Sequence, residues 1–212
     1  MKRLPFNACD YRCERCLETS ECAVYLDLQK RSLGHRLSGK DGEDDLSAAL
    51  DDMQESFREA EKMIRAGAEE FGIDIDDITT DVFDEAERRY DASRNDTLFC
   101  RSSDFTQQTR EFLKTIDPLV DGDSRAFYDD IDWHHTIVSA KVFRAVGADG
   151  NEYLHEDARD SAAVAVKSLT ICTMAFDELA SRFPDMSEIC RKLGNTVSAL
   201  KIDIRLRWLN GQ

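Results

Sequence analysis

The chain has 212 residues, 42% of them hydrophobic and 33% charged, which fits one domain or one domain with a small addition. Lys and Arg number 28 against 43 Asp and Glu, so the formal net charge is −15. A surface this acidic repels phosphate backbones and anionic membranes, which argues against nucleic-acid and membrane partners. No apolar run reaches the roughly 18 residues of a membrane-spanning helix, and no hydrophobic signal segment follows the first residues. We therefore expect an acidic, cytoplasmic protein.

The first forty residues differ from the rest of the chain in charge and in cysteine content. They hold eight basic and five acidic residues, so they are net positive, whereas the remainder is strongly negative. The sequence SGKDG at 38–42 is typical of a flexible linker. We predict two parts: a cysteine-rich metal-binding module at 1–38 and a helical bundle domain at 43–212.

Beyond the linker, apolar residues recur at steps of three and four, which is the period of an α-helix. The first stripe runs from Leu46 to Phe71, and Gly72 is placed to end that helix. Five further stripes follow, over residues 83–97, 105–116, 127–146, 162–183 and 186–208.

Capping residues and prolines predict where some of these helices begin and end. Ser103 or Asp104 is placed to open the third helix, and Asp157 to open the fifth. Pro118 follows the third helix and Pro184 the fifth, where each residue stops helical continuation. No segment alternates as a strand does, and the connections are short. The sequence therefore predicts an all-α fold: an antiparallel bundle of about six helices, preceded by a four-cysteine metal module.

Four cysteines within fourteen residues carry the strongest chemical signal. Cys9, Cys13, Cys16 and Cys22 have the spacing C-x3-C-x2-C-x5-C. Four soft thiolates from one loop can bind a tetrahedral zinc ion or ligate an iron–sulfur cluster. Disulfides are disfavoured by the odd total of seven cysteines and by a cytoplasmic location, and inert buried thiols by the Asp, Arg and Glu neighbours. We expect these four residues to ligate one metal centre.

The cysteine loop also resembles known iron–sulfur ligand loops. CDYRCERC at 9–16 resembles the C-x3-C-x2-C cluster loop of radical SAM enzymes, and the C-x2-C-x5-C spacing of 13–22 resembles part of the auxiliary-cluster spacing of SPASM domains. These local resemblances imply cluster ligation. They do not imply radical chemistry, because the rest of the chain has helical periodicity instead of alternating strands and helices. Structural zinc sites usually combine two C-x2-C pairs from separate turns, so a 4Fe–4S cluster is the preferred cofactor and zinc the alternative.

Two carboxylate–histidine pairs form a weaker pattern. Asp132-x2-His135 and Glu152-x2-His155 have the carboxylate-x2-histidine spacing found in di-iron bundles. His135 lies on an apolar stripe, where a hydrogen-bonded buried histidine is the simpler interpretation. A bundle enzyme that uses His134, His135 and nearby acids is a third hypothesis for function, and no catalytic residue is assigned.

Three further cysteines lie outside the loop: Cys100, Cys172 and Cys190. We predict that all three are small buried hydrophobic residues. The leading hypothesis for function is a soluble protein with a 4Fe–4S cluster for electron transfer or redox sensing, acting with a protein partner that the sequence does not identify. The alternative is a zinc-stabilised protein-interaction module without catalysis. Without its metal, the segment 1–22 is expected to be disordered, because it has few apolar side chains.

Overall fold

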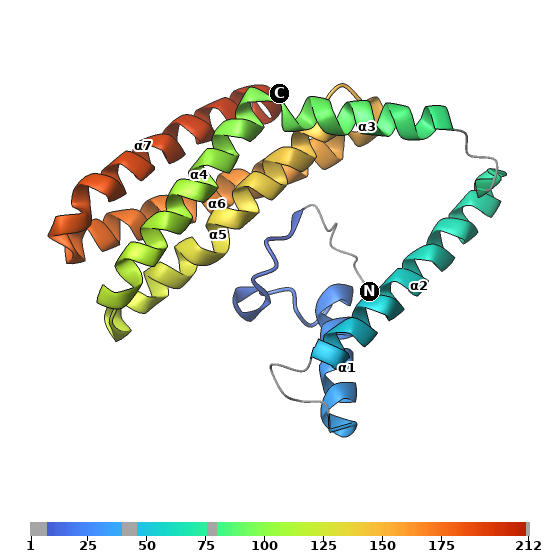
Figure 1. The fold of residues 1–212 in the computed structure, drawn as a ribbon, viewed down its shortest axis with the longest axis horizontal. Coiled ribbons are helices and arrows are strands. Elements are labelled where there is room, and N and C mark those ends of the chain that lie inside the picture. Colours follow the sequence, from blue (N-terminus) through green and yellow to red (C-terminus); the bar gives the residue numbers. More distant parts are fainter. Residues whose placement is uncertain (1–7, 40–45, 76–79, 211–212) are drawn as a thin grey trace. The chain divides into compact units, whose positions relative to one another are not determined.

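The structure, a computed structural model, describes residues 8–39, 46–75 and 80–210, and the regular elements among them are all helical (Figure 1). This confirms the prediction of an all-α protein. The α-helices are α1 (Ala23–Leu37), α2 (Leu46–Phe71), α3 (Thr80–Arg94), α4 (Thr97–Ile116), α5 (Gly122–Gly147), α6 (His155–Arg182) and α7 (Ser187–Ile204). A π-helical turn at Arg205–Leu209 extends α7. None of the helices within the described ranges has the length and apolar character that crossing a membrane requires.

Contacts within the chain divide it into two units. One unit comprises residues 12–85 and includes α1 and α2. The other comprises the four helices α4 to α7, most of α3, and the short segment 8–11 near the N-terminus. The predicted linker at 38–42 lies mostly outside the described residues, so the division into parts at 1–38 and 43–212 stays a prediction.

Helices α4 to α7 form the bundle, because each packs against the next and α7 returns against α4. Large side chains with almost no exposed surface fill its axis, among them Phe105, Phe112, Ile131, Phe176 and Leu193. Phe112 of α4 meets Phe176 of α6 edge to face, with ring centroids 5.7 Å apart, a favoured aromatic geometry. Burying each such side chain stabilises the fold by roughly 1.5–3 kcal/mol. The four predicted stripes at 105–116, 127–146, 162–183 and 186–208 thus supply this core, whereas the described residues of the stripes at 46–71 and 83–97 do not belong to it.

The start of α4 differs from the predicted one. The helix begins at Thr97, several residues before the expected cap at 103–104. The Asp96 carboxylate accepts hydrogen bonds from the backbone N–H groups of Leu98 (2.8 Å) and Phe99 (3.2 Å), two donors that the first helical turn leaves unpaired. Asp96 is therefore the true cap, and the prediction for this helix start is wrong.

Two other helix ends can be compared with their predictions. α6 begins at His155, two residues before the predicted cap Asp157, whose carboxylate instead accepts hydrogen bonds from Nε of Arg144 at 3.1 Å. The predicted end of α2 is confirmed, because Gly72 adopts the left-handed conformation, with φ of 67°, just after the last helical residue.

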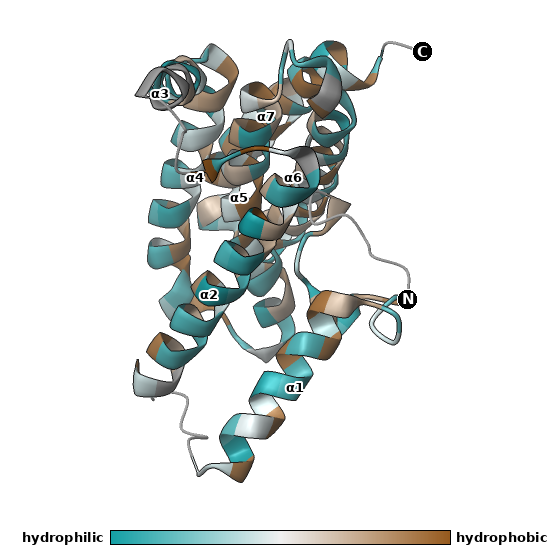
Figure 2. Ribbon diagram, turned by 90° about the vertical axis from the view of Figure 1, so that its right-hand side faces the viewer, coloured by the Kyte–Doolittle hydropathy of each residue, from teal (hydrophilic) through white to brown (hydrophobic). Residues whose placement is uncertain are grey.

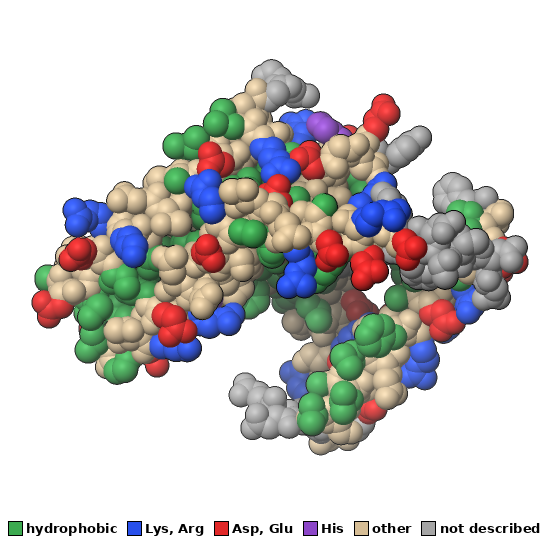
Figure 3. Space-filling view, turned by 45° about the horizontal axis from the view of Figure 1, so that its top comes forward, with side chains coloured by type: hydrophobic (Ala, Val, Ile, Leu, Met, Phe, Trp, Pro, Cys, Tyr) green, Lys and Arg blue, Asp and Glu red, His purple; other side chains and the backbone are tan. Residues whose placement is uncertain are grey.

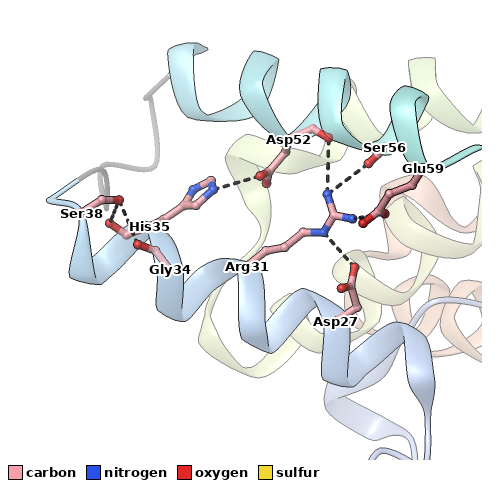
Figure 4. Close-up of polar contacts among 8 residues, drawn as sticks. All are labelled: Asp27, Arg31, Gly34, His35, Ser38, Asp52, Ser56 and Glu59. Atoms are coloured by element: carbon pink, nitrogen blue, oxygen red, sulfur yellow. Dashed lines mark hydrogen bonds and ion pairs between the residues drawn. The ribbon is translucent and has the colours of Figure 1, made fainter. Parts of the chain in front are cut away.

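In the first unit, polar side chains link α1 to α2 (Figure 4). Arg31 of α1 donates hydrogen bonds to the Asp52 carbonyl (3.4 Å), the Ser56 hydroxyl (3.1 Å) and the Glu59 carboxylate (3.1 Å), all on α2. His35 of α1 lies 3.0 Å from the Asp52 carboxylate. These contacts occupy a polar side of α2, a largely hydrophilic helix that also carries hydrophobic positions (Figure 2).

Acidic and basic side chains are interspersed on the face shown in Figure 3. In the bundle, Arg207 donates hydrogen bonds to the carboxylates of Asp96 and Asp149, each at 2.8 Å. Ion pairs at such partly exposed positions contribute at most about 1 kcal/mol each. Opposite charges are thus interspersed on this face, and in the bundle Arg207 pairs locally with two carboxylates.

Candidate metal centre

Cys13 and Cys16 lie at the two ends of one tight turn. Cys13–Arg15 form a 310 turn, and the N–H of Cys16 donates to the Cys13 carbonyl at 3.2 Å. Side chains three residues apart in a 310 turn lie on the same side of it. Both cysteines are partly exposed and neither is in a disulfide. The turn therefore presents two accessible thiols from one side.

Cys22 stands at the start of α1 and is buried, with 8% of its surface exposed. Its N–H reaches the Thr19 carbonyl at 3.4 Å, and its own carbonyl accepts the N–H of Leu26 at 3.0 Å, the first hydrogen bond of the helix. The fourth cysteine of the loop is thus placed by the helix that follows it.

Cys9 belongs to a segment that is anchored on the bundle. The N–H of Tyr11 donates to the Cys9 sulfur at 3.3 Å. The indole N–H of Trp133, on α5, donates to the Asp10 carbonyl at 2.9 Å, and Nζ of Lys167, on α6, lies 2.6 Å from the Asp10 carboxylate. These contacts fix the backbone on the C-terminal side of Cys9.

A buried lysine lies beside the same segment. Only 7% of Lys141 is exposed, and its Nζ lies 5.5 Å from the centre of the Tyr11 ring. Burial lowers the pKa of Lys141 and the nearby Arg144 lowers it further, whereas negative charge at Cys9 and Asp157 opposes the shift. Tyr11, Lys141 and Arg144 also line an open cavity of about 550 Å³. The surroundings of Cys9 therefore include a buried cation that can offset a thiolate charge.

The structure assigns the four predicted ligands to different units: Cys9 to the bundle, and Cys13, Cys16 and Cys22 to the unit that contains α1 and α2. Within the described ranges, no three His, Cys, Asp or Glu side chains form a group that could hold a metal ion. None of the four residues is in a disulfide, and thiolates are the ligands that zinc and iron–sulfur centres use. The donor chemistry of the four residues therefore fits a metal centre.

The remaining cysteines follow the prediction in two cases and depart from it in one. Cys172 and Cys190 are buried in the bundle core, and burial raises the pKa of the Cys172 thiol to about 12 and that of the Cys190 thiol to about 11. Cys100 is exposed on α4, where its sulfur lies 3.4 Å from the Arg94 carbonyl. The prediction of burial is therefore wrong for Cys100.

His134 and His135 are both buried in the bundle core. Nδ1 of His134 lies 3.2 Å from the Ser168 hydroxyl, and Nδ1 of His135 lies 2.9 Å from the Ile131 carbonyl. Because a carbonyl only accepts hydrogen bonds, Nδ1 of His135 carries the proton. Burial lowers the pKa of His135, against the opposing effect of its hydrogen bond to Ile131. His135 is thus the buried, hydrogen-bonded histidine that the apolar stripe predicts.

The second acid–histidine pair does not share one helical face. Glu152 lies in the 310 turn Glu152–Leu154, whereas His155 is the first residue of α6. Neither this pair nor Asp132 with His135 belongs to a metal-binding group among the residues that the structure describes. The structure therefore gives no support to a di-metal site in the bundle.

Sequence reasoning did not identify two lysines near the cysteine loop, Lys141 and Lys167. Arg12, within the loop, contacts Glu14. The backbone hydrogen bond of Glu14, and after it the hydrogen bond from Arg12, lower the pKa of that carboxyl. Lys141 and Lys167 come close to the Cys9 segment. Asp10 and Lys167 are 157 positions apart, and no spacing pattern connects residues at that separation.

Comparison with known proteins adds no relative: no family model, no curated protein and no solved structure matches the chain. The candidate site therefore depends on its own residues and on the local resemblance of the cysteine loop.

Proposed function

We propose that Cys9, Cys13, Cys16 and Cys22 ligate a 4Fe–4S cluster and that the protein acts in electron transfer or redox sensing. The observation that carries this proposal is the 310 turn that places Cys13 and Cys16, both partly exposed and neither in a disulfide, in C-x2-C spacing. A cluster with four thiolate ligands has no open iron for a substrate, so it would exchange single electrons.

The charges around Cys9 are compatible with this role. Four thiolates give the centre a net negative charge, and nearby cations make such a charge easier to hold. Lys141 is buried beside Tyr11, and Lys167 pairs with Asp10 on the other side of the segment. The bundle would therefore contribute the cations, while the loop contributes the sulfur ligands.

Metal binding would be coupled to folding of the loop. The four sulfur atoms must converge on the metal. The free energy of metal binding commonly offsets the entropy cost of ordering such a loop. His35 could replace Cys22 as a fourth ligand by its chemistry, but its ring already contacts the Asp52 carboxylate at 3.0 Å. We therefore assign the fourth position to Cys22.

Metal analysis of the full chain, purified without oxygen, tests this proposal. We expect a brown protein that contains iron and acid-labile sulfide in equal amounts. Cys13→Ser and Cys16→Ser should lose both. Cys100→Ser is the matched control, because it removes an exposed thiol outside the loop, and it should leave the metal content unchanged.

Two outcomes would overturn the cluster. Colourless protein with one zinc ion per chain, lost in Cys13→Ser, would replace it with the zinc-stabilised interaction module. Protein with neither metal, or with iron that survives Cys13→Ser and Cys16→Ser, would remove the cysteine loop as a metal site.

A further inference from the structure

Helix α2 carries an apolar stripe with heptad spacing. Leu46, Leu50, Met53, Phe57, Ala60, Ile64 and Gly67 follow one another at alternating steps of four and three residues. This is the a/d pattern that brings one helix against another in a coiled coil. We call these seven residues the α2 seam.

The large side chains of the α2 seam are exposed. Leu46, Leu50, Met53, Phe57 and Ile64 each keep between 44 and 71% of their surface accessible. Soluble proteins seldom leave a contiguous apolar stripe of this kind in water, and such a stripe commonly marks an interaction surface.

Helix α1 does not cover the α2 seam. Its bridging side chains, Arg31 and His35, reach Asp52, Ser56 and Glu59, none of which belongs to the seam. The leucines of α1 are themselves exposed. The polar contacts that join the two helices therefore do not involve the leucines of α1 or the α2 seam.

The bundle offers no stripe that matches the α2 seam. Its exposed large apolar residues are single positions on several elements: Leu119, Trp133, Leu154, Met174, Ile189, Ile202 and Leu206. A heptad stripe packs best against another helix that has the same spacing. Helix α1 exposes Leu26, Leu33 and Leu37 with this spacing, but Lys30 interrupts its run. Among the described residues, the longest uninterrupted exposed apolar run with heptad spacing is therefore on α2, and its best partner is a second α2.

We propose that α2 pairs with α2 of a second copy of this chain in an antiparallel coiled coil. If the two-fold axis lies between residues 57 and 60, Phe57 packs opposite the partner's Ala60. Leu50 then packs opposite the partner's Gly67, and Met53 opposite the partner's Ile64. Two of these layers pair a large side chain with a small one, and the layer of Met53 and Ile64 combines two side chains of similar size. The side-chain volume is therefore similar from layer to layer, as close packing requires.

The parallel arrangement fits less well. It would place Ala60 opposite Ala60 and Gly67 opposite Gly67, which leaves two layers without enough side-chain volume. A Cβ added to Gly67 would meet nothing within 4 Å. The space at this position is therefore open for a leucine of the partner helix.

Charge and area are both compatible with this pairing. All charged residues of α2 lie off the seam: Asp51, Asp52, Glu55, Arg58, Glu59, Glu61, Lys62, Arg65, Glu69 and Glu70. The five large seam residues expose on the order of 500 Å² per copy, so the pair would bury on the order of 1,000 Å², the lower limit for a specific interface.

The molar mass of the full chain in solution, measured by light scattering at about 100 µM, tests the interface. The wild-type protein should have twice the chain mass of 24.1 kDa. Phe57→Glu should raise the dissociation constant of the dimer at least ~100-fold, because it places an unpaired carboxylate in two symmetric layers. Lys62→Gln makes the same change in charge off the seam and should leave the dimer intact.

A charge pair tests the orientation. Met53→Glu should dissociate the dimer, and the double variant Met53→Glu/Ile64→Lys should restore it, because only the antiparallel register sets residue 53 opposite residue 64. Monomeric wild-type protein, or a dimer that Phe57→Glu leaves intact, would overturn the interface. Failure of the double variant to restore the dimer, with helical content unchanged, would overturn the antiparallel arrangement.

Discussion

At the scale of single residues, Tyr11 in the cysteine loop has an unfavourable backbone conformation. Its φ of 58° is in the left-handed region, which costs a bulky residue about 1–2 kcal/mol. The N–H of Tyr11 donates to the Cys9 sulfur, and its ring lies over Lys141. Residues held in such conformations cluster at functional sites, so the strain at Tyr11 is consistent with the proposed role of Cys9.

His135 should make the bundle sensitive to acid. Burial lowers the pKa of its imidazole in the folded state, whereas the unfolded residue titrates near 6.5. Below about pH 6.5, the unfolded chain therefore binds more protons at this position, and the free energy of unfolding falls as the pH decreases. The stabilising contribution is fully present above pH 6.5, and its loss is at most about 1.4 kcal/mol per pH unit.

Urea unfolding at pH 7.5 and pH 5.5 measures this effect. His135→Asn retains an N–H that can reach the Ile131 carbonyl but does not titrate, so it should reduce the loss of stability between the two pH values. An equal loss in the wild-type protein and in His135→Asn would show that other groups govern the acid sensitivity.

At the scale of elements, the start of α4 shows why sequence signals for helix ends can mislead. Ser103 and Asp104 are good capping residues, but they lie inside α4, because an earlier capping residue, Asp96, is reinforced by packing. Phe99 meets Phe143 of α5 edge to face, with centroids 5.0 Å apart. Tertiary contacts of the first turn thus select the cap, and the sequence does not display them.

Asp96 should be worth more than an ordinary cap. Burial raises its pKa, but the hydrogen bonds from Arg207 and from the first turn of α4 outweigh that effect, so the net pKa is lowered. Asp96→Ala should reduce the free energy of unfolding by about 1–2 kcal/mol, the upper part of the range for loss of a cap. Asp96→Asn keeps a capping oxygen without the charge and should lose less. Urea unfolding at neutral pH compares them, and equal losses would assign the effect to the ion pair with Arg207 alone.

At the scale of the whole molecule, sequence periodicity predicts the helices well and the candidate site only in part. The last four apolar stripes place the core, and Gly72 places the end of α2, because helical spacing and helix termination are local properties. The cysteine loop is also evident from local spacing. The contacts that anchor the loop on the bundle are not evident from the sequence, because Trp133 and Lys167 are separated from their partner Asp10 by most of the sequence.

The last prediction concerns how far the bundle depends on the cysteine loop. The buried core extends from Leu98 to Trp208 and contains no residue of the loop. Cys16→Ser should therefore lose the metal while it keeps its helical circular dichroism and a cooperative thermal transition. A chain that begins at Asp41 should also fold, with a modest loss of stability, because it lacks the Asp10 contacts and exposes Lys141. If either variant loses its cooperative transition, the segment around Cys9 is an integral part of the core, and the loop and the bundle fold as one unit.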